Sequence, residues 1–272
     1  MVAAVLKILL LGGLAYASGL VLLVRFQRRL VFQRFPVFAG DPKALDGLEA
    51  LRFRLATADG EELDALWTRP SIPPLAEILY LHGNASNLLT KAARIRRLTE
   101  LGFSVLAIDW RGYGTSTGSP SQGGFQRDAE AALNWLERRI DDPRVVILGE
   151  SIGSGVAVEL AARRKVGALV LEAPYVSIVD IAAARLPIFP VRSFLLDPFR
   201  SDLSIGKVGA PLLIQHGRRD RTIPFRHGER LFAMAPEPKR MIAYPHGRHD
   251  DLPERHGSYT DLKRFVVESL PS

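Results

Sequence analysis

The distribution of apolar positions divides the chain into an N-terminal apolar segment and a longer alternating region. From Val2 to Val24 the only charged side chain is Lys7, and the run from Ile8 to Val24 is uninterrupted. A run of about 17 residues is at the lower end of the length that spans a bilayer. It continues past the small residues 15–18, where a signal peptide would be cleaved, so it predicts an uncleaved anchor. A cleaved signal peptide and a buried core helix are the alternatives.

After residue 47, short apolar runs alternate with patterns of helical period. Residues 48–55 and 63–69, joined by the turn Asp59-Gly60, predict an antiparallel pair of strands. Further strands are predicted at 78–81, 105–108, 145–148, 168–171, 211–215 and 240–244, and helices at 87–101, 125–140, 154–162 and 258–270. This alternation predicts an α/β fold whose sheet is mostly parallel and carries helices on both faces.

One segment interrupts the alternation. The stretch from Ile181 to Leu196 is apolar and broken by prolines. We interpret residues 174–207 as a short lid insertion of small helices that lines an apolar pocket, with ordinary packing between two strands as the alternative. The predicted organisation is an anchor with a basic flank over residues 1–34 and one α/β domain over residues 35–272.

Composition changes this picture in two ways. The net charge is +7, but the arginines occur in small scattered groups rather than one stripe, which disfavours a nucleic-acid partner. The group Arg25, Arg28, Arg29 and Arg34 directly follows the apolar run. The positive-inside bias therefore predicts a single-pass membrane protein with its domain on the cytoplasmic side, an exported domain being the alternative. The chain has no cysteine, which excludes disulfides and thiolate chemistry.

The candidate chemistry centres on Gly149-Glu150-Ser151-Ile152-Gly153. This motif follows a predicted strand and precedes a predicted helix, the context in which Gly-x-Ser-x-Gly forms a nucleophile elbow. The stretch Gly114 to Gly118 fits the same pattern around Ser116, but loop-forming residues follow it. We therefore expect Ser151, rather than Ser116, to be a nucleophile.

A nucleophilic serine needs a base and a carboxylate that orients the base. His249 follows the last predicted strand and is the expected base, with His246 as the alternative. Asp220 follows the strand at 211–215 and is the expected acid, with Asp202 as the alternative. The order Ser151, Asp220, His249 is the one this architecture favours.

The oxyanion that forms during acyl transfer needs N–H donors. We expect the backbone N–H of Ile152 and that of Asn84, in the loop after Leu81, with Ala85 as the alternative to Asn84. The glycines lack the spacing of a dinucleotide or phosphate loop, and a triad already accounts for the histidines and aspartates near the C-terminus. No cofactor and no metal are therefore expected.

Taken together, these motifs resemble the α/β-hydrolase superfamily. Three stretches carry the resemblance from about Leu48 onward: His82-Gly83-Asn84-Ala85, residues 109–114 (DWRGYG) and the Ser151 motif. With the apolar N-terminal segment and the basic, aromatic stretch from Arg25 to Phe32, the chain looks like the membrane-anchored α/β-hydrolase-domain serine hydrolases.

The resemblance implies a serine hydrolase that cleaves an ester, thioester or peptide-like acyl bond through an acyl-enzyme. Its substrate would be a small molecule, a lipid or an acylated protein, and its membrane partner would be reached through the N-terminal helix. The alternative function is a non-catalytic, membrane-tethered binding or scaffold domain on a hydrolase fold.

Overall fold

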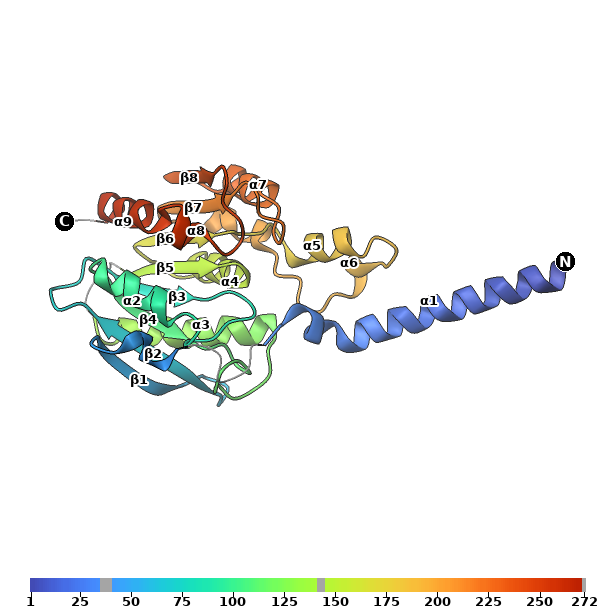
Figure 1. The fold of residues 1–272 in the computed structure, drawn as a ribbon, viewed down its shortest axis with the longest axis horizontal. Coiled ribbons are helices and arrows are strands. Elements are labelled where there is room, and N and C mark those ends of the chain that lie inside the picture. Colours follow the sequence, from blue (N-terminus) through green and yellow to red (C-terminus); the bar gives the residue numbers. More distant parts are fainter. Residues whose placement is uncertain (35–40, 141–144, 271–272) are drawn as a thin grey trace.

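The computed structural model describes residues 1–34, 41–140 and 145–270. The predicted boundary between anchor and domain, at residue 35, lies outside the described residues. Within them, a single sheet forms the centre of the molecule, and one long helix projects from it (Figure 1).

The sheet has eight strands in the order β1-β2-β4-β3-β5-β6-β7-β8. The strands are β1 (Glu49–Ala56), β2 (Glu62–Arg69), β3 (Glu77–Leu81), β4 (Ser104–Ile108), β5 (Val145–Glu150), β6 (Ala168–Glu172), β7 (Leu212–Gly217) and β8 (Lys239–Tyr244). Strand β2 is antiparallel to β1 and to β4, and all other pairs are parallel. The mostly parallel sheet with an antiparallel lead-in confirms the predicted fold class.

Helices cover both faces of the sheet. Each face has its own buried apolar cluster. Side chains of α3 (Gln122–Glu137), α4 (Ile152–Ala161) and α7 (Arg226–Met234) belong to one cluster, and side chains of α2 (Ala92–Glu100) and α9 (Ser258–Ser269) belong to the other. The strands between them are apolar on both sides; all five residues of β3, β4 and β6 are buried. Burial on both faces is the reason these strands read as continuous apolar runs.

The helix predicted at 87–101 begins only at Ala92. Asn87 and Thr90 bind each other's backbone N–H groups through their side chains, at 2.8 and 2.9 Å. Such side-chain bonds offer the backbone a turn in place of a helix. The spacing of the apolar residues gives no sign of these side-chain bonds, so it predicts a helix that starts too early.

The predicted insertion lies between β6 and β7. It consists of α5 (Ile178–Arg185), α6 (Val191–Phe194) and the 3-10 turns η2 (Ser201–Leu203) and η3 (Ile205–Lys207). Pro187 and Pro190 lie between α5 and α6, where proline prevents the helix from continuing. In Figure 1, α5 and α6 extend from the sheet on the side from which α1 projects.

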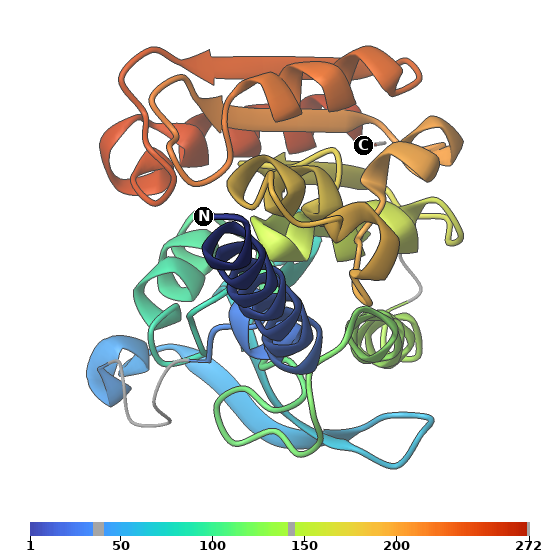
Figure 2. The ribbon, with the colours of Figure 1, turned by 90° about the vertical axis from the view of Figure 1, so that its right-hand side faces the viewer.

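Helix α1 (Val2–Val31) is long and apolar enough to cross a membrane by length and composition. Residues 2–18 are exposed, and Figure 2 looks onto the side of the molecule from which the helix projects. Its C-terminal end is attached to the domain, because the next residue, Phe32, is only 3% exposed. The Phe32 ring packs edge-on against Phe125, with centroids 5.2 Å apart, and lies 6.1 Å from Phe199.

Candidate active site

Ser151 occupies a strained turn between β5 and α4. Its backbone has φ 51° and ψ −117°, a conformation that non-glycine residues rarely adopt. A Cβ at Gly153 would lie 2.1 Å from the carbonyl oxygen of Leu81, and one at Gly149 would lie 2.6 Å from the Cβ of Ala157. Only glycine fits where strand and helix approach so closely, so the two flanking glycines allow the sharp turn that presents the serine.

The structure brings the three predicted triad side chains to hydrogen-bond distance. Nε2 of His249 lies 3.0 Å from Oγ of Ser151, and Nδ1 of His249 lies 2.7 Å from Oδ2 of Asp220. The other carboxylate oxygen of Asp220 accepts the backbone N–H groups of Thr222 and Ile223, each at 2.8 Å. Asp220 is thus fixed by its own turn after β7, and it faces the loop after β8 that carries His249.

The pKa shifts of Asp220 and His249 favour an ionised carboxylate beside a basic imidazole. Burial alone would raise the pKa of Asp220, but hydrogen bonds from His216 and His249 outweigh burial and hold it well below its usual range. Burial alone would lower the pKa of His249, but the hydrogen bond to Asp220 and the carboxylate charge raise it above its ordinary value. An ionised carboxylate only accepts hydrogen bonds, so Nδ1 of His249 donates and Nε2 faces Ser151 as the acceptor.

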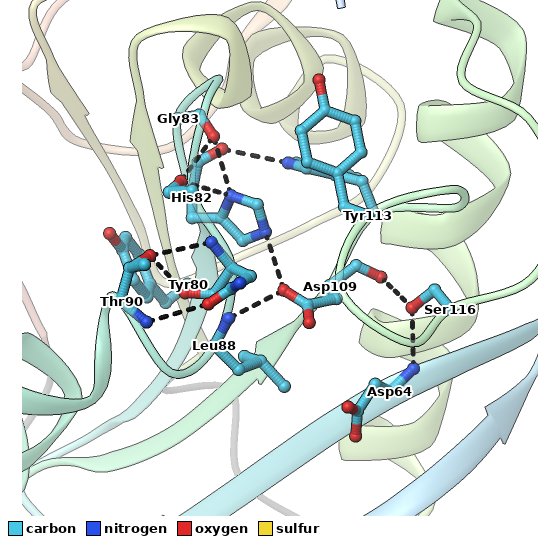
Figure 3. A network of polar contacts seen from close by, with 12 residues as sticks. Asp64, Tyr80, His82, Gly83, Leu88, Thr90, Asp109, Tyr113 and Ser116 are labelled. Atoms are coloured by element: carbon cyan, nitrogen blue, oxygen red, sulfur yellow. Dashed lines mark hydrogen bonds and ion pairs between the residues drawn. The ribbon is translucent and has the colours of Figure 1, made fainter. Parts of the chain in front are cut away.

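The alternative side chains lie elsewhere. His246 is exposed at the surface, and Asp202 forms a two-point ion pair with Arg200, at 2.8 and 2.6 Å. Ser116 binds the loop after β4 to β2: its Oγ donates to the carbonyl of Asp109 at 2.7 Å and accepts the N–H of Asp64 at 2.8 Å (Figure 3). The second Gly-x-Ser-x-Gly stretch is therefore part of a structural turn.

The candidate oxyanion donors come from two elements. Ile152 begins α4, and N–H groups in the first turn of a helix have no partner within that helix. Asn84 follows β3, and both Ile152 and Asn84 line a cavity together with Ser151. The N–H of Ala85 donates to the carbonyl of Gln33 at 2.9 Å, which leaves Asn84 as the better placed of the two loop candidates.

Buried polar groups hold the loop after β3, which includes Asn84, and Figure 3 shows His82, Gly83 and Asp109 among them. Nδ1 of His82 lies 2.8 Å from the carbonyl oxygen of Gly83, and its Nε2 lies 3.4 Å from Oδ1 of Asp109. The indole N–H of Trp110 donates to the carbonyl of His82 at 3.0 Å. Asp109 also accepts the N–H of Leu88 at 2.8 Å, so the loops after β3 and β4 form one unit.

Sequence reasoning assigned no role to the charged residue beside the serine. Glu150 lines the cavity, and its carboxylate receives Nζ of Lys91 at 2.6 Å and the hydroxyl of Tyr80. Arg94 lies 3.5 Å away and forms a 2.6 Å ion pair with Glu172. Despite burial, Lys91 and Arg94 hold the pKa of Glu150 well below its usual range. Glu150 therefore places a negative charge near the site, and its partners, on β3 and at the start of α2, are distant in sequence.

A cavity of about 710 Å³ opens at Ser151 and His249. Its size is within the range of about 300–1,000 Å³ that small-molecule sites occupy. The largest apolar part of its wall comes from α1, α5, α6 and the residues that follow α5 and α6: Leu23, Leu30, Val31, Ile178, Ile181, Ala182, Leu186, Val191, Phe194 and Leu195. The insertion thus lines an apolar pocket, as expected. The contribution of α1 was not expected, because its apolar residues are already accounted for by a membrane anchor.

Comparison with known proteins places the fold in a family. Residues 77–197 match the alpha/beta hydrolase fold family. The chain is 37% identical to "Uncharacterized protein Rv2307c" of Mycobacterium tuberculosis, over 93% of this chain and 92% of that one. It is 31% identical to "Alpha/beta hydrolase domain-containing protein 17C" of Xenopus tropicalis, over 85% of this chain and 73% of that one.

Among solved structures, the Pyrococcus furiosus esterase Pf2001 matches with a TM-score of 0.73 and 20% identity, over 88% of this chain and all of that one. At this identity the likeness concerns the fold alone. The sequence matches at 31–37% identity extend over most of both chains and therefore show the family. The chain belongs to the α/β-hydrolase superfamily.

Proposed function

We propose that this protein is a membrane-anchored serine hydrolase that cleaves an ester, thioester or related acyl bond through an acyl-enzyme. One observation carries the proposal: Oγ of Ser151, the imidazole of His249 and the carboxylate of Asp220 form a continuous hydrogen-bonded chain at 3.0 and 2.7 Å. This chain ends at an apolar cavity beside two candidate oxyanion donors. Nucleophile, base and orienting acid in this geometry are the requirements of acyl transfer.

In the first half of the reaction, Oγ of Ser151 attacks the acyl carbon while Nε2 of His249 takes the hydroxyl proton. The carbonyl oxygen becomes an oxyanion, which the N–H groups of Ile152 and Asn84 stabilise. Asp220 stabilises the imidazolium and keeps Nδ1 as the protonated nitrogen. The bond to the leaving group then breaks, His249 returns the proton to the leaving group, and Ser151 stays acylated.

In the second half, water replaces the leaving group. Nε2 of His249 takes a proton from the water, whose oxygen attacks the acyl carbon of the Ser151 ester. Collapse of the second oxyanion releases a carboxylic acid and returns the proton to Oγ of Ser151. The raised pKa of His249 makes its neutral imidazole a stronger base for taking the proton from Ser151 or from water.

Labelling with a fluorophosphonate probe tests the nucleophile, and the chain offers a matched control. The wild-type protein and Ser116→Ala should both be labelled, because Ser116 lies in the other Gly-x-Ser-x-Gly stretch and only braces a turn. Ser151→Ala should lose labelling and ester turnover. Labelling that persists in Ser151→Ala would place the nucleophile elsewhere. A folded wild-type protein without any labelling would favour a binding or scaffold domain instead.

The base is tested by a second matched pair. His249→Ala should abolish turnover of short-chain esters, whereas His246→Ala should retain it, because His246 is exposed and lies outside the cavity lining. If His249→Ala keeps near-normal turnover, the base assignment is wrong.

The anchor forms the second part of the proposal. Two observations support an uncleaved membrane helix: residues 2–18 of α1 are exposed, and its C-terminal end is bound to the domain through Gln27, Arg28 and Phe32. The arginines after the apolar run favour a cytoplasmic domain. Full-length protein should sediment with membranes, and deletion of residues 1–17 should release it without detergent. Equal recovery of the full-length protein in a membrane-free fraction contradicts the anchor.

A further inference from the structure

Helix α1 is packed against the insertion along one face. Residues at spacings of about four, namely Gly19, Leu23, Gln27 and Val31, are at least partly buried, whereas their neighbours Val21 and Leu22 are 66% and 57% exposed. This periodicity is that of one side of a helix. The side of α1 that is withdrawn from solvent therefore faces the domain.

Specific contacts hold α1 and the insertion together. The Tyr16 ring stacks on Phe189 with centroids 5.2 Å apart, and its hydroxyl donates to the carbonyl of Ile188 at 3.0 Å. Farther along the helix, the Gln27 side chain accepts the N–H of Leu196 at 2.7 Å. These contacts span about eleven residues of α1, or about 16 Å at 1.5 Å per residue.

Arg28 and the end of α1 complete the attachment. Arg28 forms a 2.8 Å ion pair with Asp197, which follows the insertion's apolar stretch. The side chain of Asn84 donates to the carbonyl of Val31 at 2.7 Å and accepts the N–H of Gln33 at 2.9 Å. Because Asn84 also lies beside Ser151 in the cavity, the end of α1 directly contacts the candidate oxyanion loop.

We propose that α1 forms one wall of the acyl-binding pocket, and that the pocket receives the aliphatic chain of a substrate drawn from the lipid bilayer. This inference rests on the proposed function. Leu23 and Val31 at the α1 end line the cavity at Ser151, and Ile181 and Leu186 of the insertion line it as well. An aliphatic chain fits between these apolar surfaces, while its carbonyl group lies at Ser151.

The position of Leu23 supports entry from the bilayer. It lies in the apolar run that predicts the membrane span, and it also lines the cavity that contains the serine. On the insertion, Ile188 is 70% exposed where its carbonyl meets Tyr16, and Leu196 is 61% exposed where its N–H meets Gln27. Exposed apolar side chains next to a membrane-spanning helix suit contact with lipid. The pocket therefore begins at the depth where the helix leaves the bilayer.

Chain-length selectivity tests this proposal with two matched pairs of variants in full-length protein. Leu23→Trp fills the pocket from α1, and Leu22→Trp places the same ring on the exposed side of the helix. Ile181→Trp fills the pocket from α5, and Ala184→Trp is its exposed counterpart. The measurement is kcat/KM for dodecanoyl and butanoyl p-nitrophenyl esters, with the protein in liposomes of neutral phospholipid.

Both filling variants should lower the ratio of dodecanoyl to butanoyl turnover by about tenfold or more, equivalent to about 1.4 kcal/mol. The two exposed variants should keep the wild-type ratio. Fluorophosphonate labelling of each variant shows that the serine site is folded.

The outcomes separate the two proposals. If Leu23→Trp gives the ratio of Leu22→Trp while Ile181→Trp lowers it, the pocket lies on the insertion alone and α1 is not its wall. If all four variants keep the wild-type ratio, no aliphatic chain occupies this cavity. Absence of labelling and of turnover in the wild type overturns the serine mechanism itself, and with it the pocket assignment.

Discussion

Nε2 of His216 lies 3.3 Å from Oδ2 of Asp220, the carboxylate oxygen that His249 also contacts. His216 is fully buried, and its Nε2 also lies 2.9 Å from the carbonyl oxygen of Ile223. Both neighbours of Nε2 are acceptors, so Nε2 carries the proton and donates. His216 is thus a positioning residue that shares the carboxylate with the candidate base.

Replacing His216 should therefore affect the base through Asp220. In His216→Phe the carboxylate loses one donor, which raises the pKa of Asp220 and strengthens its hold on the protonated His249. We expect kcat/KM to fall about tenfold, equivalent to about 1.4 kcal/mol, because Asp220 without this donor positions His249 less well. The acid limb of the pH profile should also move to higher pH. A variant with reduced activity but an unmoved limb would assign His216 to packing alone.

The pH dependence of the wild type follows from the raised pKa of His249. The imidazole accepts a proton only when it is neutral, so kcat/KM should fall as the pH drops through this raised pKa. The pKa of Asp220 is well below its usual range, so the carboxylate stays ionised throughout that limb. Activity that is constant well below the ordinary pKa of histidine would contradict His249 as the base.

Asp220→Asn should move the acid limb in the opposite direction from His216→Phe. Removing the negative charge and the acceptor lowers the pKa of His249, so the limb shifts to lower pH. At the same time the amide no longer selects the protonated Nδ1, and kcat should fall by roughly 10⁴-fold. The two variants are distinguished by pH profiles under the same conditions. A limb that moves upward in Asp220→Asn would exclude this carboxylate as the partner of His249.

The serine turn should tolerate no side chain at Gly153. In Gly153→Ala the new Cβ meets the backbone carbonyl of Leu81 at 2.1 Å, and neither element can withdraw without unpacking α4 from β3. We expect a marked fall in melting temperature, measured by circular dichroism. The control is Gly123→Ala on α3, where the nearest atom is the flexible tip of Arg127 at 3.7 Å. There alanine should be neutral or stabilise the helix by up to about 1 kcal/mol.

The attachment of α1 predicts that truncations differ in stability. Deletion of residues 1–17 leaves Phe32 packed against Phe125 and Phe199, whereas deletion of residues 1–34 removes it from that cluster. The longer deletion should lower the free energy of unfolding by about 3–5 kcal/mol more than the shorter one, as expected for loss of a buried phenylalanine. Equal urea midpoints for the two proteins would contradict a structural role for Phe32.

Much of the fold could be predicted from local patterns. Strands β3, β4 and β6 are buried on both faces, so they appear in the sequence as uninterrupted apolar runs. The start of α2 was predicted five residues too early, because the bonds between Asn87 and Thr90 depend on side-chain geometry rather than on apolar periodicity. Patterns of apolar residues report which face is buried, but they do not report what caps or delays an element.

The residues of the candidate site also fall into two groups, those that the sequence predicted and those that it did not. The proximity of Ser151, Asp220 and His249 could be predicted because each follows a strand, and parallel strands bring their carboxyl ends to one edge of the sheet. Glu150, Lys91 and His216 were not identified, because their roles depend on contacts between elements far apart in sequence.

The sequence by itself determined the strand and helix order, the glycine-flanked serine and an N-terminal segment apolar enough to span a membrane. These features are encoded in neighbouring residues, through side-chain size, periodicity and backbone freedom. Only the tertiary structure decided that residues of α1 line the cavity at Ser151 and that Asn84 binds the end of that helix. A segment's composition does not reveal which side of it packs against the protein, because that choice is made by partners more than fifty residues away.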